Sequence, residues 1–133
     1  MTFLERVNNG EVISNMDLTD KENKKIAFNL LQNKQESISE HVGKRFSFTA
    51  YLITKAIFND EDPEAQKKKE GVKICLKTDY GAWYSTSSMA VLNGLETWEH
   101  MFGVMSDGNP METAVKEVQS GNNSKFKYIN LEL

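Results

Sequence analysis

The stretch Lys77–Gly103, KTDYGAWYSTSSMAVLNGLETWEHMFG, decides the fold of this chain. It opens on the end of a strand, which meets a tight turn at Asp79-Tyr80-Gly81 and continues as an aromatic strand over 82–86. Ser87 or Ser88 then caps an amphipathic helix, which stops at the final glycine of the stretch. A β-hairpin that feeds directly into a helix, with further strands on both sides, predicts a small closed β-barrel crossed by one helix.

The helix over 88–102 carries apolar residues at the spacing i, i+4, i+7 and i+11, which places them on one face. These residues are Val91, Leu95, Trp98 and Phe102. We expect this face to lie in the core, with Trp98 as a buried plug rather than a ring that contacts a ligand.

Earlier in the chain, from Lys44 onward, hydrophobic residues recur with a period of two, in the segment GKRFSFTAYLITKAIF. Alternation predicts two faces, Phe46, Phe48, Ala50 and Leu52 against Arg45, Ser47, Thr49 and Tyr51. A strand of this length must bend to stay within a small domain. A second strand over 72–78 sets Val72, Ile74 and Leu76 against Lys73, Cys75 and Lys77, and a hairpin of 112–119 and 125–133 closes the chain.

The N-terminal part of the chain lies outside the predicted barrel. Residues 1–18 show no sustained period, and we expect an irregular arm that is dispensable for folding. A domain over 19–133 follows, and it begins with an amphipathic helix at about 20–36, capped by Thr19 or Asp20. The arm and this helix are the candidates for self-association.

Composition places the chain among ordinary globular proteins. Of its 133 residues, 39% are hydrophobic and 26% are charged, and no apolar run has the length of a membrane span. The N-terminus lacks the apolar region of a signal peptide, and the single cysteine, Cys75, fits a reducing cytoplasm. The net charge of −3 argues against a uniformly basic nucleic-acid-binding surface, but net charge does not report the local field.

The motifs of common enzymes and cofactor sites do not occur. The sequence contains no GxxxxGK[ST], GxGxxG, CxxC or HExxH motif, and His41 and His100 lie far apart. We therefore expect no enzyme, no cofactor and no metal site.

Aromatic and cationic residues on the predicted strands point instead to a single-stranded nucleic acid. Rings stack on bases, and lysine or arginine contacts phosphates. The opposing interpretation is that these are ordinary strand aromatics. Of the neighbours Trp83 and Tyr84, we expect Trp83 to be exposed and Tyr84 to be packed. The candidate binding residues are Lys44, Arg45, Tyr51, Lys73, Lys77, Tyr80, Trp83, Lys125, Phe126, Lys127 and Tyr128.

The order strand, strand, strand, helix, hairpin resembles the OB-fold, a five-stranded barrel. Residues 40–133 also resemble the single-stranded DNA-binding proteins of phages and conjugative elements of Gram-positive bacteria. The resemblance rests on GKRFSFTAYLI, on the closing hairpin, and on a T-x-x-G-x-x-Y-x-x-x-S pattern at Thr78, Gly81, Tyr84 and Ser88. It implies a mainly β, OB-like barrel with an added N-terminal helix.

The same resemblance implies a cytoplasmic protein of a bacterial host that coats or protects single-stranded DNA during replication, recombination or transfer. RNA stays open as a ligand. The chain departs from the common bacterial proteins of this kind because it ends on an apolar strand, Ile129–Leu133, rather than on a long linker with an acidic tip. We therefore expect no recruitment of partners through such a tail.

Two further functions stay open. An OB-like barrel can also be a protein-interaction module, for example an inhibitor of a host factor, and the acidic net charge favours this alternative. A third is a binder of small molecules or oligosaccharides, since OB barrels serve these too.

Overall fold

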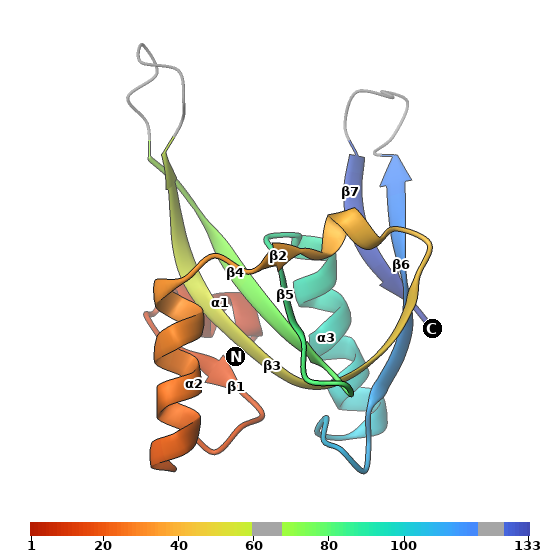
Figure 1. Ribbon diagram of the computed structural model, residues 1–133. Helices are drawn as coiled ribbons and strands as arrows, with labels where there is room; N and C mark the ends of the chain where they lie inside the picture. Colours follow the sequence, from red (N-terminus) through yellow and green to blue (C-terminus); the bar gives the residue numbers. More distant parts are fainter. Residues whose placement is uncertain (60–67, 120–126) are drawn as a thin grey trace.

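A long, bent strand, β3 (Arg45–Asn59), organises the structure. The computed structural model describes residues 1–59, 68–119 and 127–133. Within them, seven strands form one curled sheet, a half-barrel, in the order β2-β5-β4-β3-β6-β7 with β1 added on β3 (Figure 1). The other strands are β1 (Ile13–Ser14), β2 (Glu36–Ser37), β4 (Lys68–Thr78), β5 (Trp83–Thr86), β6 (Met111–Gln119) and β7 (Lys127–Glu132).

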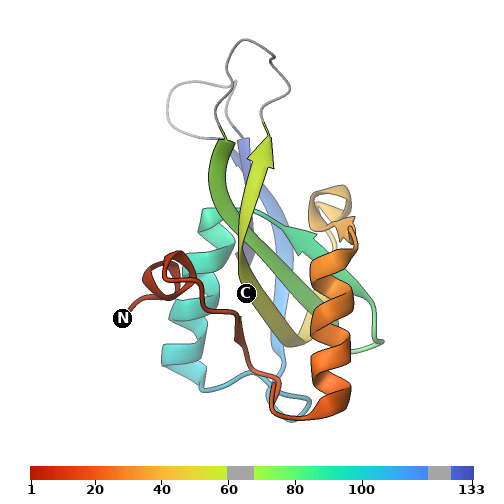
Figure 2. The ribbon, with the colours of Figure 1, turned by 90° about the vertical axis from the view of Figure 1, so that its left-hand side faces the viewer.

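Three α-helices of the described residues cover this sheet, α1 (Phe3–Asn8), α2 (Lys21–Gln32) and α3 (Met89–Phe102). Figure 2 shows α1 and α3 on one side of the sheet and α2 on the other. The residues that sequence analysis expected to start two of them do so, since the side chains of Asp20 and Ser88 accept hydrogen bonds from the first turns of α2 and α3. The expectation of a mainly β fold with helices is confirmed at this level.

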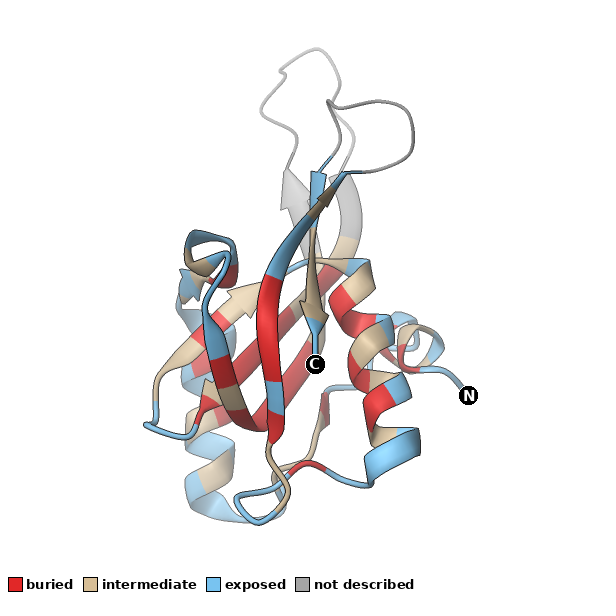
Figure 3. Cartoon of the chain, turned by 90° about the vertical axis from the view of Figure 1, so that its right-hand side faces the viewer, coloured by how far each residue is buried: buried red, intermediate tan, exposed pale blue. Residues whose placement is uncertain are grey.

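The main core lies between the sheet and the pair α1 and α3. Val91, Leu95 and Trp98 of α3 are buried there, as the helical spacing predicts. Figure 3 shows the buried segments of the strands facing this helix. Phe102 was expected in the same core and is not, because it is the last helical residue, and its ring meets only the edge of the core beside Trp98, with 51% of its surface exposed.

A smaller core lies on the other face, under α2. Ala27 and Leu30 of α2 pack there against Leu52 and Cys75, and Trp83 packs partly buried against the same group. The sheet is therefore covered on both faces in this region, so the face that holds Lys73, Cys75 and Lys77 is not an open platform.

A β-bulge changes the faces of β3 at Thr49. Phe48 pairs with Thr78 and Ala50 pairs with Lys77, so one residue of β3 has no opposite partner on β4. Phe46 and Phe48 face the main core before the bulge, and Tyr51 and Ile53 face it afterwards. The prediction that Tyr51 is exposed is wrong for this reason, since a shift of one residue moves a side chain to the other face.

The first 18 residues are built into the fold rather than irregular. Phe3 and Val7 of α1 and Ile13 of β1 are buried in the main core. The side chain of Asn15 accepts from the Tyr51 amide at 2.8 Å and donates to the Thr49 carbonyl at 3.0 Å, so it satisfies the backbone at the bulge. The expectation of an arm that is dispensable for folding is at odds with this packing, whereas self-association through the segment stays a prediction.

The two end strands of the sheet, β2 and β7, do not pair in the described part of the chain, which leaves the half-barrel open between them. β2 adds to the free edge of β5 in a parallel pairing, Glu36 opposite Tyr84 and Ser37 opposite Ser85. The 3₁₀ helix η1 (Ile38–His41) follows and contacts both β5 and β6, with Ile38 fully buried. The segment between α2 and β3 thus packs against strands on both sides of the opening.

Candidate functional site

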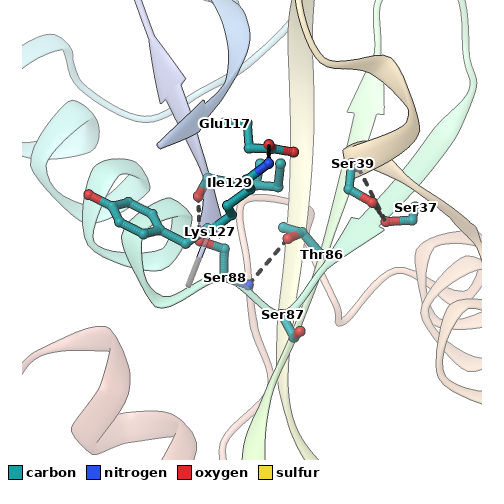
Figure 4. A pocket seen from close by; sticks show the side chains of 9 residues that line it. Ser37, Ser39, Thr86, Ser87, Ser88, Glu117, Lys127 and Ile129 are labelled. Carbon is teal, nitrogen blue, oxygen red and sulfur yellow. Dashed lines mark hydrogen bonds and ion pairs between the residues drawn. The ribbon is translucent and has the colours of Figure 1, made fainter. Parts of the chain in front are cut away.

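Two adjoining hollows form a groove across the open edge of the sheet. The first, of about 370 Å³, lies between the end of β5 and β7 (Figure 4). The second, of about 560 Å³, lies between the C-terminal end of α2 and the sheet. Ser37, Thr86 and Ser87 line both hollows, so the two adjoin. We call this combined hollow the seam groove.

Several serine and threonine hydroxyls line the seam groove, beside apolar side chains such as Leu31, Val72 and Ile129. Ser37, Ser39, Ser85, Thr86, Ser87 and Ser88 all line it. Four of these residues are consecutive, Ser85-Thr86-Ser87-Ser88, and they lie where β5 ends and α3 begins. Ser88 caps α3 and donates its hydroxyl proton to the Ile129 carbonyl, which ties this turn to β7. The chain at the mouth of the groove is therefore fixed by its own hydrogen bonds, whereas the Ser87 side chain is exposed.

Cationic side chains stand at both ends of the seam groove. At the α2 end, Lys34 is exposed, and Lys73 donates its ammonium protons to the carbonyls of Leu30 and Asn33 at 2.6 and 2.9 Å. Lys73 therefore satisfies the C-terminal end of α2, and its charge interacts favourably with the helix dipole there. At the β7 end, Lys127 lies 3.4 Å from Glu117, and both side chains are about half exposed, so this ion pair is weak.

An aromatic ring flanks the β7 end. Tyr128 lines the first hollow with 41% of its surface exposed. A ring in this position offers a face for stacking beside Lys127. The seam groove therefore combines neutral hydrogen-bonding groups, cations at both ends and one accessible ring.

A separate aromatic cluster lies at the opposite rim, where the hairpin of β4 and β5 turns. Tyr80 is exposed, and its hydroxyl lies 3.2 Å from that of Tyr84. This hydrogen bond, with burial, raises the pKa of Tyr84 to about 12. The Tyr84 ring is buried against Phe46, at 5.5 Å between ring centroids, and against His41, at 4.7 Å. Tyr84 is thus packed, as expected, and has no free face for a base.

The hollow at this rim carries mixed charge. It has about 240 Å³ and is lined by Arg45, Asp79 and Glu112 together with Phe46, Ser47 and Tyr80. Two carboxylates against one guanidinium make it a poor site for a polyanion. The seam groove is the better candidate.

The residues expected to bind nucleic acid fall into several places. Lys73, Lys127 and Tyr128 line the seam groove. Lys44, Arg45 and Tyr80 lie exposed near the opposite rim. Lys77 and Trp83 are cross-strand partners on the face under α2, and both are half-buried, so Trp83 is less exposed than expected. Lys125 and Phe126 lie outside the described residues.

Tyr51 is removed from the candidates. It is buried, and its hydroxyl donates to Glu99 at 2.8 Å. Burial and this hydrogen bond raise its pKa well above the usual range. Tyr51 therefore has a structural role between β3 and α3.

Sequence reasoning missed Lys34, Gln35, Ser37 and Ser39 and the hydroxyls of the 85–88 run. The segment 34–39 carries no period, and only its pairing with β5 brings it to the groove. The run Ser-Thr-Ser-Ser before a helix was a signal in the sequence, but it was used only as a helix cap.

No cluster of His, Cys, Asp and Glu able to hold a metal ion occurs among the described residues. Within the same ranges, none of the helices has both the length and the apolar character to cross a membrane. The Cys75 thiol is buried under α2, and burial raises its pKa to about 11, against a smaller opposing effect of Lys73, so it stays protonated at neutral pH.

Comparisons with protein-family models, with curated proteins and with solved structures found no match to this chain. The geometry of the seam groove is therefore the main indication of what the protein binds.

Proposed function

We propose that this protein is a non-catalytic binder of single-stranded DNA and that the strand lies in the seam groove. The observation that carries the proposal is the adjacency of two hollows whose linings contain several hydroxyls and, in each hollow, at least one lysine. Two adjoining hollows of this kind suit a flexible, linear polyanion. Serine and threonine hydroxyls and lysine are among the usual partners of phosphate oxygens.

The order of the strands supports the proposal. The path β5-β4-β3-β6-β7, with α3 between β5 and β6, is the order expected of an OB-type barrel. We propose that the half-barrel is a variant of that fold, in which β2 occupies the edge of β5. OB-type barrels bind oligonucleotides across one face of the sheet and with the loops beside it.

In the proposed complex, aromatic rings contact bases and cationic side chains contact phosphates. Tyr128 stacks on a base, and Lys34 and Lys127 contact phosphates. To do so, Lys127 gives up its exposed ion pair with Glu117. Neither kind of contact identifies a base, so binding has little sequence preference. The biological role in this proposal is to coat or protect single strands during replication, recombination or transfer.

The test is binding of fluorescent oligo-dT at several salt concentrations, with variants matched between the two rims. Tyr128→Ala should weaken binding about tenfold with an unchanged salt slope, because a ring releases no counterions. Lys34→Gln should weaken binding and flatten the slope by about 0.7, the value for one phosphate contact on a single strand. Tyr80→Ala and Lys44→Gln change an exposed tyrosine and an exposed lysine at the opposite rim and should have little effect.

If the opposite-rim variants lose affinity and the groove variants do not, the groove is the wrong site. If the folded protein binds no oligo-dT even at low salt, the proposed function is wrong. Oligo-U of the same length measures the preference for DNA over RNA.

A protein-interaction module is the second candidate, and an exposed apolar cluster favours it. Met101, Phe102 and Val104 at the end of α3 are all more than half exposed. The net charge of −3 fits this alternative as well. A folded protein that does not bind oligo-dT would favour this cluster as the binding site for another protein.

A further inference from the structure

The outward face of α2 carries a basic and aromatic stripe. Lys21, Lys24, Lys25 and Phe28 follow the spacing i, i+3, i+4 and i+7, which places them on one side of the helix. They line, with Asn29, a shallow hollow of about 500 Å³. We call Lys21, Lys24, Lys25 and Phe28 the α2 face.

Folding does not account for the exposure of Phe28. The opposite side of α2 packs on the sheet through Ala27 and Leu30, so Phe28 points away from the smaller core. Its ring keeps 63% of its surface in solvent. An exposed phenylalanine among lysines contributes little to stability, whereas it offers an accessible ring for a ligand.

The α2 face carries three lysines, and acidic residues of the same segment, Asp17, Asp20 and Glu22, balance part of their charge. Among its three lysines, Lys25 lies 3.3 Å from Glu22, in an ion pair whose side chains are 60% and 76% exposed. Such a pair is weak and screened by salt. The chain as a whole is acidic, so this local concentration of lysines favours an anionic ligand.

The α2 face leads towards the seam groove. About one helical turn beyond Phe28 lies Leu31, which is exposed and lines the groove, and Lys34 follows at the same end of the helix. Lysines, a ring and the groove therefore follow one another along a single helix. An acidic peptide would match the charges alone, whereas an exposed ring beside lysines, with Lys34 further along at the groove, suits the bases and phosphates of a single strand.

We infer that the α2 face is a second contact region for the strand that occupies the seam groove, with Phe28 stacking on a base and the lysines contacting phosphates. This inference rests on the proposed function. Its consequence is a dependence on length, because a short oligonucleotide fills the groove alone and a longer one reaches Phe28.

The experiment compares oligo-dT of about 8 and about 30 nucleotides, within and beyond the usual site size of one OB-type barrel. Phe28→Ala should weaken binding of the longer oligonucleotide about tenfold and leave the short one unchanged. The triple change of Lys21, Lys24 and Lys25 to Gln should flatten the salt slope by about 2 for the longer oligonucleotide only, at about 0.7 per contact. Met101→Ala and Lys44→Gln, which change an exposed apolar residue and an exposed lysine that line neither region, are the matched controls.

The possible outcomes separate the two proposals. If the wild-type protein binds both lengths and the α2-face variants, folded by circular dichroism, bind both as tightly, the inference is overturned and the proposed function stands. If the wild-type protein binds neither length, the proposed function fails and the inference fails with it. Displacement of the longer oligonucleotide by polyglutamate as readily as by unlabelled oligo-dT would assign the α2 face to acidic proteins and overturn the inference.

Discussion

Trp98 and Phe102 lie one helical turn apart on α3 and their rings touch, with centroids 5.4 Å apart. They differ in their surroundings, because 7% of Trp98 is exposed and 51% of Phe102 is exposed. Removal of a large side chain costs stability only to the extent that the side chain is enclosed, since an exposed site leaves no cavity.

We therefore expect Trp98→Ala to lower the free energy of unfolding by ~3–5 kcal/mol. Phe102→Ala should change it by less than about 1 kcal/mol, because its ring contacts mainly Trp98 and solvent. Urea unfolding followed by circular dichroism measures both. Equal losses in the two variants would contradict the placement of Phe102 at the edge of the core.

The bulge at Thr49 also limits how much of β3 has its core-facing residues predicted correctly from the sequence. Simple alternation describes Phe46 and Phe48 correctly and fails from Ala50 onward, because the bulge adds one residue to the strand. Nothing in RFSFTAYLI signals the bulge, since the sequence holds no glycine or proline there. Its partner, Asn15, comes from a distant segment. This explains why the two faces of β4 were predicted correctly over Val72–Lys77, where the register with β3 is unbroken, and Tyr51 was not; the strand itself begins earlier than expected, at Lys68.

At the scale of elements, strong periodicity was a reliable guide. The helices expected at about 20–36 and at 88–102 are found as α2 and α3, with α2 shorter by its last turn. The N-terminal segment was missed because α1 has six residues, too few for a period to be recognised. A signal existed in Thr2, which caps the helix, and in the i, i+4 pair of Phe3 and Val7.

The N-terminal elements should contribute to stability as core elements do. Ile13 of β1 is buried opposite Ile53, whereas its neighbour Val12 is exposed. Ile13→Ala should lower the free energy of unfolding by ~2–5 kcal/mol, because it leaves a cavity in the main core. Val12→Ala, a matched change of an adjacent residue, should stay within about 0.5 kcal/mol of wild type.

Thermal and urea unfolding of both variants test this placement. A folded Ile13→Ala variant with wild-type stability would mean that the N-terminal segment detaches from the sheet in solution. Sedimentation of the same two variants measures whether the segment also affects self-association.

At the scale of the whole molecule, the position of the groove follows from topology that local sequence does not encode. Residues near 34–39, 85–88 and 127–129 meet only because β2 pairs with β5 and because β7 lies across the opening from β5. Pattern analysis could identify the strands that bear Lys73 and Lys127. It could not identify the opening between them, since that depends on how far the sheet curls.

The packing of the whole molecule also determines its response to alkaline pH. Burial raises the pKa of the Cys75 thiol to about 11, from an ordinary value near 9. Burial, and then the hydrogen bond to Glu99, raise the pKa of Tyr51 above its ordinary value near 10. In both groups the folded state holds the proton more tightly than the unfolded state does. Below about pH 9 both states keep these protons, and the stability that they contribute is fully present.

As the pH rises above about 9, the unfolded chain releases first the cysteine proton and then the tyrosine proton, while the folded chain keeps both. The free energy of unfolding should therefore fall by about 1.4 kcal/mol per pH unit for each proton retained, until the folded-state pKa is reached. Urea midpoints at pH 8 and at about pH 10.5 measure this loss.

The double variant Cys75→Ala, Tyr51→Phe should start from a lower stability and lose less of it over the same interval. Tyr128→Phe removes the hydroxyl of an exposed tyrosine and should keep the wild-type profile. A wild-type midpoint that does not fall between the two pH values would show that Cys75 and Tyr51 are not enclosed in solution as they are in this structure.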